Sequence, residues 1–331
     1  MTRIKWGIIG PGSIATTFAT ALEQSKQGQL YGIASRSSER ATAFAQRFAV
    51  SKIYHQYSDL ITDPEVDILY IATPHSHHYQ IAKACLEAGK HILLEKPLTI
   101  NASQTQVLIE LSQSKGLVFQ EALWSRFMPC FAKVKDWLKA GKIGALQYIQ
   151  SDIGFAFADK PQHRLNDPLL AGGALLDLGV YSISISQFLL EQTPIQVQAT
   201  SQLAANGIDK TTQVNMRFAQ GQLSQFSCSI TAKCTNTMTL VGEQGRIHLP
   251  EHFWVGQEAQ LFQDGELVEC ARFTHPVNGF EYQIEAAMQC IVQGKVCSDL
   301  MPHADSLDVM RVMDEVRKQI NLRYHDDIEN I

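Results

Sequence analysis

Three side chains far apart in the sequence have types and spacing suited to proton transfer: Lys96, Asp177 and Tyr181. A phenol exchanges a proton with a hydroxyl or carbonyl more readily when a nearby ammonium lowers its pKa from about 10. Asp177 and Tyr181 are four residues apart, so on a helix they share one face, where the carboxylate orients the pair. Taken singly, each has a plainer explanation as a core tyrosine, a surface lysine or a helix-face carboxylate. The elements that position them decide between these interpretations.

A glycine-rich turn near the N-terminus supplies the first such element. Gly10, Gly12 and Ala15 form a G-x-G-x-x-A pattern between an apolar strand at 6–9 and a helix at 14–22. In this pattern the first glycine permits the tight turn, the second admits a pyrophosphate, and the alanine allows close packing. The helix N-terminus offers free N–H groups to phosphate oxygens. The alternative is an ordinary βα turn, but this context favours dinucleotide binding.

The end of the second strand indicates which dinucleotide binds. An NAD site usually has an acidic residue about 20 positions after the fingerprint, which binds the ribose 2′-hydroxyl. Here Ser35, Arg36 and Ser37 follow the strand, and the first carboxylate is Glu39. A guanidinium binds a 2′-phosphate in a charge-assisted pair, and Arg40 lies one helical turn further on. The pattern favours NADP, with the alternative that Arg36 only covers the sheet edge.

Glu95-Lys-Pro97 directly follows the buried strand 91–94, so Lys96 is expected at the carboxyl ends of the strands, where open α/β sheets bind ligands. The cofactor-binding residues predicted from these segments are Gly10, Gly12, Ser13, Ile14, Ser35, Arg36, Ser37, Arg40, Thr73, Pro74, His78, Glu95 and Lys96.

Aromatic and basic residues beyond the last strand of the first half are candidates for a substrate pocket. They are Trp124, Arg126, Phe127, Phe157, Arg164, Trp254 and Phe280. Core packing is the rival interpretation for Phe127, but less so for Arg126, because a charge is rarely buried unpaired. Such a pocket suits either a sugar ring or a hydrophobic dihydrodiol.

The cluster of His75, His77 and His78 invites a metal interpretation, since imidazoles are common metal ligands. No C-x-x-C or H-E-x-x-H spacing supports it, so we expect no metal. We predict instead a loop on the cofactor side, in which His78 hydrogen-bonds the backbone.

Composition limits the class of protein. The chain has 331 residues, 45% hydrophobic and 18% charged, which is typical of a globular protein with two domains. A net charge of −5 and a pI near 6.1 predict no nucleic-acid or membrane partner. We expect no membrane-spanning helix, that is, no apolar run approaching the roughly 20 residues that one needs, and no signal peptide, because the first strand begins too early for one. Seven cysteines without a C-x-x-C pair are expected to be free thiols in the cytoplasm.

Two halves have different periodicity. Residues 1–122 alternate apolar strands with helices, which predicts a doubly wound parallel (Rossmann) sheet that binds NADP. Residues 123–331 alternate polar and apolar residues along runs such as 147–153, 212–218 and 222–230. They predict an α+β domain on a large, mostly antiparallel open sheet that binds substrate. Helices are expected at 172–190 and 304–320, and we expect the last one to pack back on the first half.

The ordered motifs resemble the glucose–fructose oxidoreductase/inositol dehydrogenase (Gfo/Idh/MocA) family along essentially the whole chain. They are Gly10-Pro-Gly-Ser-Ile-Ala15, Ala72-Thr-Pro-His-Ser-His-His78, Glu95-Lys-Pro97 and Gly172-Gly-Ala-Leu-Leu-Asp-Leu-Gly-Val-Tyr181. Within that family, Glu121-Ala-Leu-Trp-Ser-Arg-Phe-Met-Pro129 and Tyr181 are most similar to dimeric dihydrodiol dehydrogenases and NADP-dependent D-xylose dehydrogenases. Many other members have histidine at the position of Tyr181.

The resemblance implies that Lys96 and Tyr181 are the catalytic pair, with Asp177 beside them. It also implies a cis peptide before Pro97 and a homodimer joined through the C-terminal sheet. Two positions depart from the pattern. Ser184 stands where many sugar-oxidising members have a substrate-binding aspartate, and His75 stands where asparagine is common.

Together these patterns predict an NADP-dependent oxidoreductase that acts on a CH–OH or CH–CH donor, either an aldopyranose such as D-xylose or a trans-dihydrodiol. One rival hypothesis is an enzyme that keeps its cofactor bound and reduces one sugar while oxidising another. The other is a non-catalytic NADP-binding sensor, which would have no need of Lys96, Asp177 and Tyr181.

Overall fold

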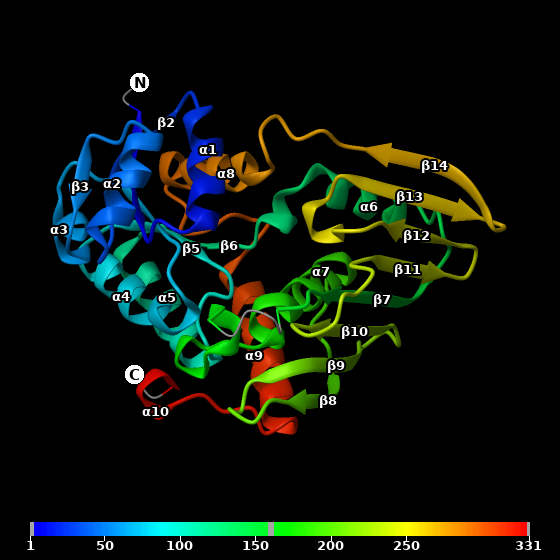
Figure 1. Ribbon diagram of the computed structural model, residues 1–331. Helices are drawn as coiled ribbons and strands as arrows, with labels where there is room; N and C mark the ends of the chain where they lie inside the picture. The colour runs from blue at the N-terminus through cyan, green and yellow to red at the C-terminus, as the bar shows by residue number, and fades with distance from the viewer. Residues whose placement is uncertain (1–2, 158–161, 330–331) are drawn as a thin grey trace.

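The computed structural model describes residues 3–157 and 162–329, which form two halves lying side by side (Figure 1). The first half is a six-stranded parallel sheet in the order β3-β2-β1-β4-β5-β6. Its strands are β1 (Ile4–Ile9), β2 (Gly28–Ala34), β3 (Lys52–Tyr54), β4 (Ile68–Ile71), β5 (His91–Glu95) and β6 (Phe119–Ala122). Its helices are α1 (Ser13–Glu23), α2 (Ser38–Arg47), α3 (Tyr57–Thr62), α4 (His78–Glu87) and α5 (Ala102–Lys115). The predicted Rossmann sheet is confirmed.

The register of this sheet aligns the segments that could bind a ligand. Ile9 of β1 pairs with Ile71 of β4, and Ile71 pairs with Leu94 of β5. The segments that begin at Gly10, Ala72 and Glu95 therefore start at the same edge of the sheet. All residues of β4 are buried, because helices cover both faces of a parallel sheet.

The second half is an eight-stranded sheet in the order β14-β13-β12-β11-β7-β10-β9-β8. Its strands are β7 (Leu146–Gly154), β8 (Gln196–Leu203), β9 (Asp209–Arg217), β10 (Leu223–Ser229), β11 (Met238–Gly242), β12 (Gly245–Leu249), β13 (Glu258–Gln263) and β14 (Glu266–Arg272). Neighbouring strands are antiparallel except β7 and β10, which run parallel. The mostly antiparallel sheet is confirmed.

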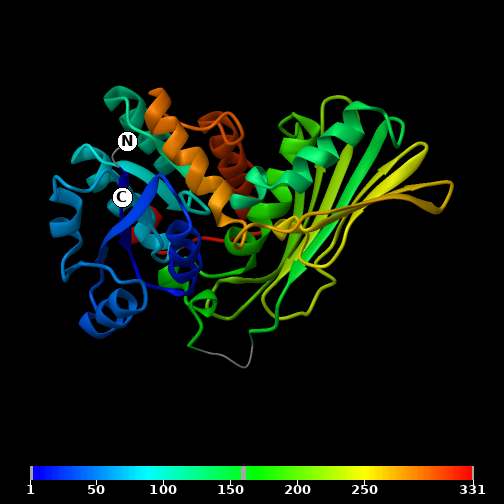
Figure 2. The same ribbon diagram turned by 90° about the horizontal axis from the view of Figure 1, so that it is seen from above.

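Helices α6 (Pro129–Lys139) and α7 (Val180–Leu190) cover the face of this sheet toward the first half, and no described element covers the other (Figure 2). This uncovered face is the one through which the resemblance implied a homodimer, and its exposed residues are mainly polar. A row of amides crosses four neighbouring strands in register, and it consists of Gln198, Asn215, Gln225 and Gln150. Exposed apolar side chains such as Tyr148 and Leu223 lie in the adjacent row.

The helix predicted at 172–190 contains a π-helical segment, Leu175–Gly179, before α7 begins at Val180. The stretch Pro168–Leu190 has the length and composition of a membrane-crossing helix, so the expectation that no run approaches that length is wrong. Its most apolar window is 89% buried within the fold, as in the core helix of a soluble protein.

Two later helices return to the first half. Helix α8 (Phe280–Gln293) places Phe280, Ile284 and Met288 in the core around α1, and α9 (His303–Gln319) packs on α5, as expected. A short helix, α10 (Asp326–Glu329), follows. The sequence analysis did not predict β3, α3, α6 or α8. The first two are short edge elements, whereas the spacing of the buried residues of α8 follows the helical period and could have revealed it.

Candidate active site

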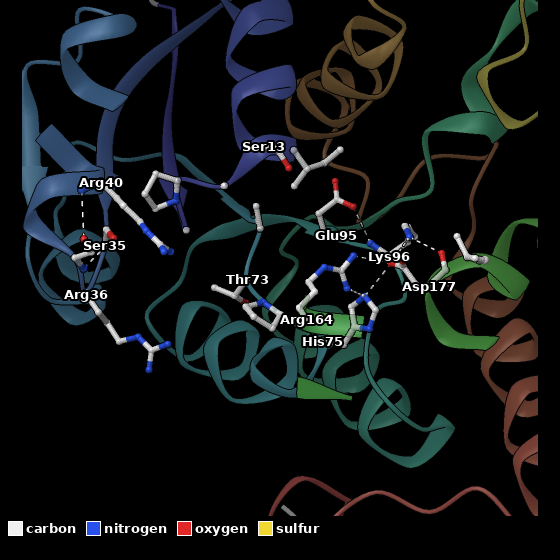
Figure 3. Close-up of a pocket in the computed structure, with 18 of the residues that line it drawn as sticks. Ser13, Ser35, Arg36, Arg40, Thr73, His75, Glu95, Lys96, Arg164 and Asp177 are labelled. Carbon is white, nitrogen blue, oxygen red and sulfur yellow. Dashed lines mark hydrogen bonds and ion pairs between the residues drawn. The ribbon is translucent and has the colours of Figure 1, made fainter. Parts of the chain in front are cut away.

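A cavity of about 820 Å³ opens where the edge of the six-stranded sheet meets the second half (Figure 3). It brings together segments from β1, β2, β4 and β5 with the π-helical segment and the β12–β13 loop. The residues that line it are Gly10, Pro11, Gly12, Ser13, Ile14, Ser35, Arg36, Ser37, Arg40, Tyr57, Ala72, Thr73, Pro74, His75, Glu95, Lys96, Ile153, Phe155, Arg164, Asp177, Leu178, Tyr181 and Trp254. Every predicted cofactor residue except His78 is among them.

The glycine turn forms one part of this cavity. Gly10 has φ +95°, and a Cβ there would lie 2.9 Å from the carbonyl oxygen of Ala72. A Cβ on Gly12 would meet nothing within 4 Å, so space is open above the backbone at this residue. Helix α1 begins at Ser13 with no side-chain cap and no acidic residue in its first turn. Its N–H groups and positive dipole end therefore favour an anion.

The turn after β2 forms the far end of the cavity. The Ser35 hydroxyl accepts a hydrogen bond from the Ser37 N–H, and the Ser37 hydroxyl caps α2 by accepting one from the Arg40 N–H. These bonds hold the turn from which Arg36 and Arg40 extend (Figure 3). Neither arginine takes part in an ion pair within the described part of the chain. Tyr57 also lines this end, and it was missed because the sequence analysis did not predict α3.

Lys96 follows β5, and its peptide bond to Pro97 is cis, as the resemblance implied. Its ammonium donates to the backbone oxygen of Asp177 at 2.7 Å and to Asp177 Oδ1 at 3.0 Å. Burial lowers the pKa of Lys96, but the combined charges of Asp177, Tyr181 and Glu95 outweigh it and leave the pKa above 10.5. Tyr70 donates to the neighbouring carboxylate of Glu95, whose pKa burial raises. Lys96 is therefore a charged group fixed by the second half of the chain.

Three groups converge on one oxygen of Asp177. Its Oδ1 lies 3.0 Å from Lys96 Nζ, 2.8 Å from a terminal nitrogen of Arg164 and 3.5 Å from His75 Nε2 (Figure 3). Burial raises the pKa of this carboxyl, but the charges of Lys96 and Arg164 outweigh it and hold the pKa well below 3.8. The π-helical segment that contains Asp177 places it at the boundary between the halves.

Tyr181 lies beside this cluster. The Lys96 ammonium is 4.9 Å from the centre of its ring, and Trp124 Nε1 donates to the phenol oxygen at 3.1 Å. Burial raises the pKa of Tyr181, and the opposing effects of Lys96 and Trp124 do not reverse it. The expectation of a lowered phenol pKa is therefore wrong, because burial destabilises the phenolate more than the nearby cation stabilises it.

The predicted substrate residues divide into two groups. Trp254 and Arg164 line the cavity, together with Phe155 and Ile153, which the sequence analysis missed. Both missed residues lie at the end of β7, whose alternation of buried and exposed residues could have revealed them. Trp124 lies behind Tyr181 rather than on the cavity surface.

The other predicted pocket residues pack elsewhere and do not line the cavity. Phe127 is buried in the core of the second half, and Phe280 in that of the first, 4.8 Å from the ring of Trp124. Phe157 stacks on His163. Arg126 is buried outside the cavity, where it forms an ion pair with Asp305.

His78 and His75 have structural contacts. The ring nitrogens of His78 lie 2.9 Å from the backbone oxygens of Thr73 and Pro97, which confirms the predicted backbone bonding. Burial lowers its pKa to about 3, so the ring is neutral and joins two cavity segments without lining the cavity. His75 does line it, although the sequence analysis did not place it in the site. Within residues 3–157 and 162–329, no His, Cys, Asp and Glu cluster could hold a metal ion.

This arrangement defines an oxidoreductase with an NAD-binding Rossmann fold. The family model for the oxidoreductase family of that fold (GFO_IDH_MocA) matches residues 4–123, and the model for its C-terminal domain matches residues 131–248. The chain belongs to the Gfo/Idh/MocA oxidoreductase family, as its motifs implied.

Similar proteins span the whole chain. The trans-1,2-dihydrobenzene-1,2-diol dehydrogenase of Mus musculus is 33% identical, and the alignment covers 98% of this chain and 99% of that protein. The enzyme of the same name from Danio rerio is 31% identical over the same shares. An aldose-aldose oxidoreductase from Caulobacter crescentus superposes with a TM-score of 0.87 at 22% identity, over 96% of this chain and 98% of that one. A 3-ketoreductase from Actinomadura kijaniata, solved with NADP and TDP-benzene, gives 0.85 at 25% identity over the same shares.

Proposed function

We propose that this protein is an NADP-dependent dehydrogenase that oxidises a trans-dihydrodiol or an aldopyranose such as D-xylose, with Tyr181 and Lys96 as its proton relay. The observation that carries the proposal is the convergence of Lys96, Asp177 and Tyr181 in the same cavity as the Gly10–Gly12 turn. Relatives that share about a third of the sequence are named as dihydrodiol dehydrogenases, which favours that substrate class.

The residues around the turn fit a dinucleotide. The space above Gly12 and the uncapped N-terminus of α1 suit a pyrophosphate. Arg36 and Arg40, which have no carboxylate partner among the described residues, suit the 2′-phosphate that distinguishes NADP from NAD. A bound nicotinamide would supply the hydride acceptor. Lys96, directly after β5, would then lie at the carboxyl edge of the sheet, beside the ring.

The chain's own residues would move the proton. Trp124 donates to the phenol oxygen of Tyr181, and this bond stabilises the phenolate that takes the proton of the substrate hydroxyl. Lys96 adds its positive charge from 4.9 Å above the ring, and Asp177 holds Lys96 both charged and in place. Trp254 and Phe155 form an aromatic wall that excludes water and packs against a ring.

A panel of aldopyranoses and trans-dihydrodiols tests this proposal, with NADP or NAD as acceptor and absorbance of the reduced cofactor as the readout. We expect turnover with at least one compound and faster turnover with NADP. If both cofactors bind and no compound is oxidised, the protein is a sensor rather than a dehydrogenase.

We also propose that the protein is a homodimer joined through the uncovered face of the eight-stranded sheet. Amides in register across Gln198, Asn215, Gln225 and Gln150 are donors and acceptors at once, so they can pair with the same row of a second chain. Light scattering at micromolar concentration should give twice the 36.9 kDa of one chain, and a mass of 36.9 kDa would exclude the dimer.

We also propose that the enzyme is cytoplasmic. All seven cysteines are free thiols, and three of them, Cys234, Cys270 and Cys297, are only partly buried. Free thiols persist in a reducing compartment. Fractionation of the source cells with an activity assay tests this location.

A further inference from the structure

Arg164 is a charged side chain at the cavity that the proposed proton transfer does not use. It lies in a short 3₁₀ turn, Arg164–Asn166, and its side chain is 40% exposed, whereas the side chain of Asp177 is 10% exposed. The guanidinium therefore stands on the surface of the cavity, with Asp177 behind it.

Two acceptors fix the orientation of this guanidinium. One terminal nitrogen donates to Asp177 Oδ1 at 2.8 Å, and the other lies 3.4 Å from His75 Nε2. Burial lowers the pKa of His75, so its ring is neutral, and its Nδ1 lies 3.3 Å from the backbone oxygen of Ala171. With the proton on Nδ1, the lone pair on Nε2 accepts from Arg164.

Most N–H groups of the Arg164 guanidinium have no hydrogen-bond partner among the described residues. A guanidinium has five N–H groups, and the two contacts above use two of them. Arg164 has no other hydrogen bond to the described residues, so three N–H groups remain for a ligand or water. Lys96 and Arg164 both donate to Oδ1 of Asp177. The second carboxylate oxygen, Oδ2, accepts no hydrogen bond from the described residues.

This arrangement suits a hydroxyl group, which both donates and accepts. A substrate hydroxyl can donate to Asp177 Oδ2 and accept from Arg164. Lys96 contacts the same carboxylate as Arg164, and its ammonium lies 4.9 Å from the centre of the Tyr181 ring, where the reacting oxygen would bind. Two neighbouring oxygens of a substrate can therefore be bound at once, and Trp254 and Phe155 add apolar rings to the lining of the same cavity.

We propose that Arg164 is the specificity-determining residue of this enzyme, which selects substrates with a hydroxyl on the carbon next to the reacting carbon. The proposal rests on the proposed dehydrogenase function. Arg164 orients the substrate through that second oxygen and takes no part in proton transfer. Its effect is therefore expected mainly in KM, and only for substrates that have the vicinal hydroxyl.

Matched substrate pairs test this role. The pairs are trans-1,2-cyclohexanediol with cyclohexanol, and D-glucose with 2-deoxy-D-glucose, each with saturating NADP. We expect the wild type to favour the vicinal member in kcat/KM by about 10- to 100-fold, as for a hydrogen bond to a charged group. In Arg164→Gln this preference should fall to within about threefold, mainly through KM. Arg164→Lys, which keeps the charge but not the planar fork, should lie between them.

Arg311→Gln is the matched control, because Arg311 also pairs with an aspartate, Asp308, but is exposed and lies outside the cavity. It should leave the preference unchanged. An equal loss on both members of a pair in Arg164→Gln would show that Arg164 only supports Lys96 and Asp177, and would overturn the inference. So would a wild type without preference.

A binding measurement separates this inference from the proposed function. Change in NADPH fluorescence on adding each member of a pair reports ternary binding without turnover. Binding of the vicinal member that Arg164→Gln weakens, with no turnover, would refute the dehydrogenase and keep the recognition site. Equal binding of both members to the wild type would refute the recognition site.

Discussion

The two ends of the cavity are built in different ways. At the cofactor end, one short segment supplies the turn, the open space above Gly12 and the N-terminus of α1. At the substrate end, Lys96 from the first half and Asp177 from the second meet 81 residues apart in sequence. The cofactor end depends on backbone geometry and the substrate end on side chains that neutralise one another.

This difference has an energetic consequence. A backbone site is formed whenever its strand, turn and helix form, so it requires little free energy beyond that of folding. The substrate end holds a largely buried lysine and carboxylate beside the more exposed Arg164, and the buried charges are stable there because they are paired. Substitutions at the cofactor end should therefore change cofactor affinity alone, whereas those at the substrate end should change turnover.

The largest effect is expected from Tyr181→Phe at the substrate end. Loss of the phenol should reduce kcat by about 10² to 10⁴, because general acid–base groups contribute that much. The affinity for NADP should stay the same, since the ring and its packing remain. Tyr79→Phe, at a buried tyrosine outside the cavity, is the control for loss of a phenol. Turnover within a few-fold of wild type would remove Tyr181 from the mechanism.

Arg36→Ala tests the cofactor end. The affinity for NADP should fall by about one to two decades and that for NAD should change little, because only NADP carries the 2′-phosphate. Cofactor titration by fluorescence measures both. Arg47→Ala, at the end of the helix α2 that follows Arg36 and outside the cavity, should change neither. Equal losses for the two cofactors would contradict the assignment of NADP.

Gly12→Val separates backbone geometry from side-chain chemistry. Gly12 has φ −91° and ψ −174°, which other residues also adopt, and a Cβ there meets no atom within 4 Å. The thermal midpoint should therefore stay near that of the wild type, while both cofactors should bind at least about tenfold more weakly. Unchanged affinity would show that the pyrophosphate does not cross Gly12.

Trp124→Phe should give the smallest effect, and it acts through pH. It removes the hydrogen bond to the phenol oxygen, so the already raised pKa of Tyr181 should rise further. Below that pKa the phenolate fraction falls tenfold for each unit of increase, so oxidation at pH 8 should slow by a few-fold to about tenfold. The kcat/KM profile should move to higher pH. A slower enzyme with an unmoved profile would assign Trp124 to packing alone.

Part of this site could be predicted because its signals are local. The glycine pattern, the serines and arginines after β2 and the lysine after β5 each lie within a few residues of the element that positions them. All of them line the cavity. The substrate wall could not be predicted in the same way. Arg126 and Phe127 are residue types that are typical of a pocket. In the fold Arg126 pairs with Asp305 and Phe127 is buried in the core of the second half, so neither lines the cavity.

The sequence by itself determined the two periodicities, the edge at which the loops gather and the residue types that could transfer a proton. These follow from steric and hydrophobic preferences that act over one strand or one helical turn. It takes the folded chain to bring Lys96 and Arg164 onto one oxygen of Asp177 with His75 beside it, and to raise the pKa of Tyr181 by burial. Charge pairing and desolvation depend on which groups meet in space, and no spacing along the chain encodes that.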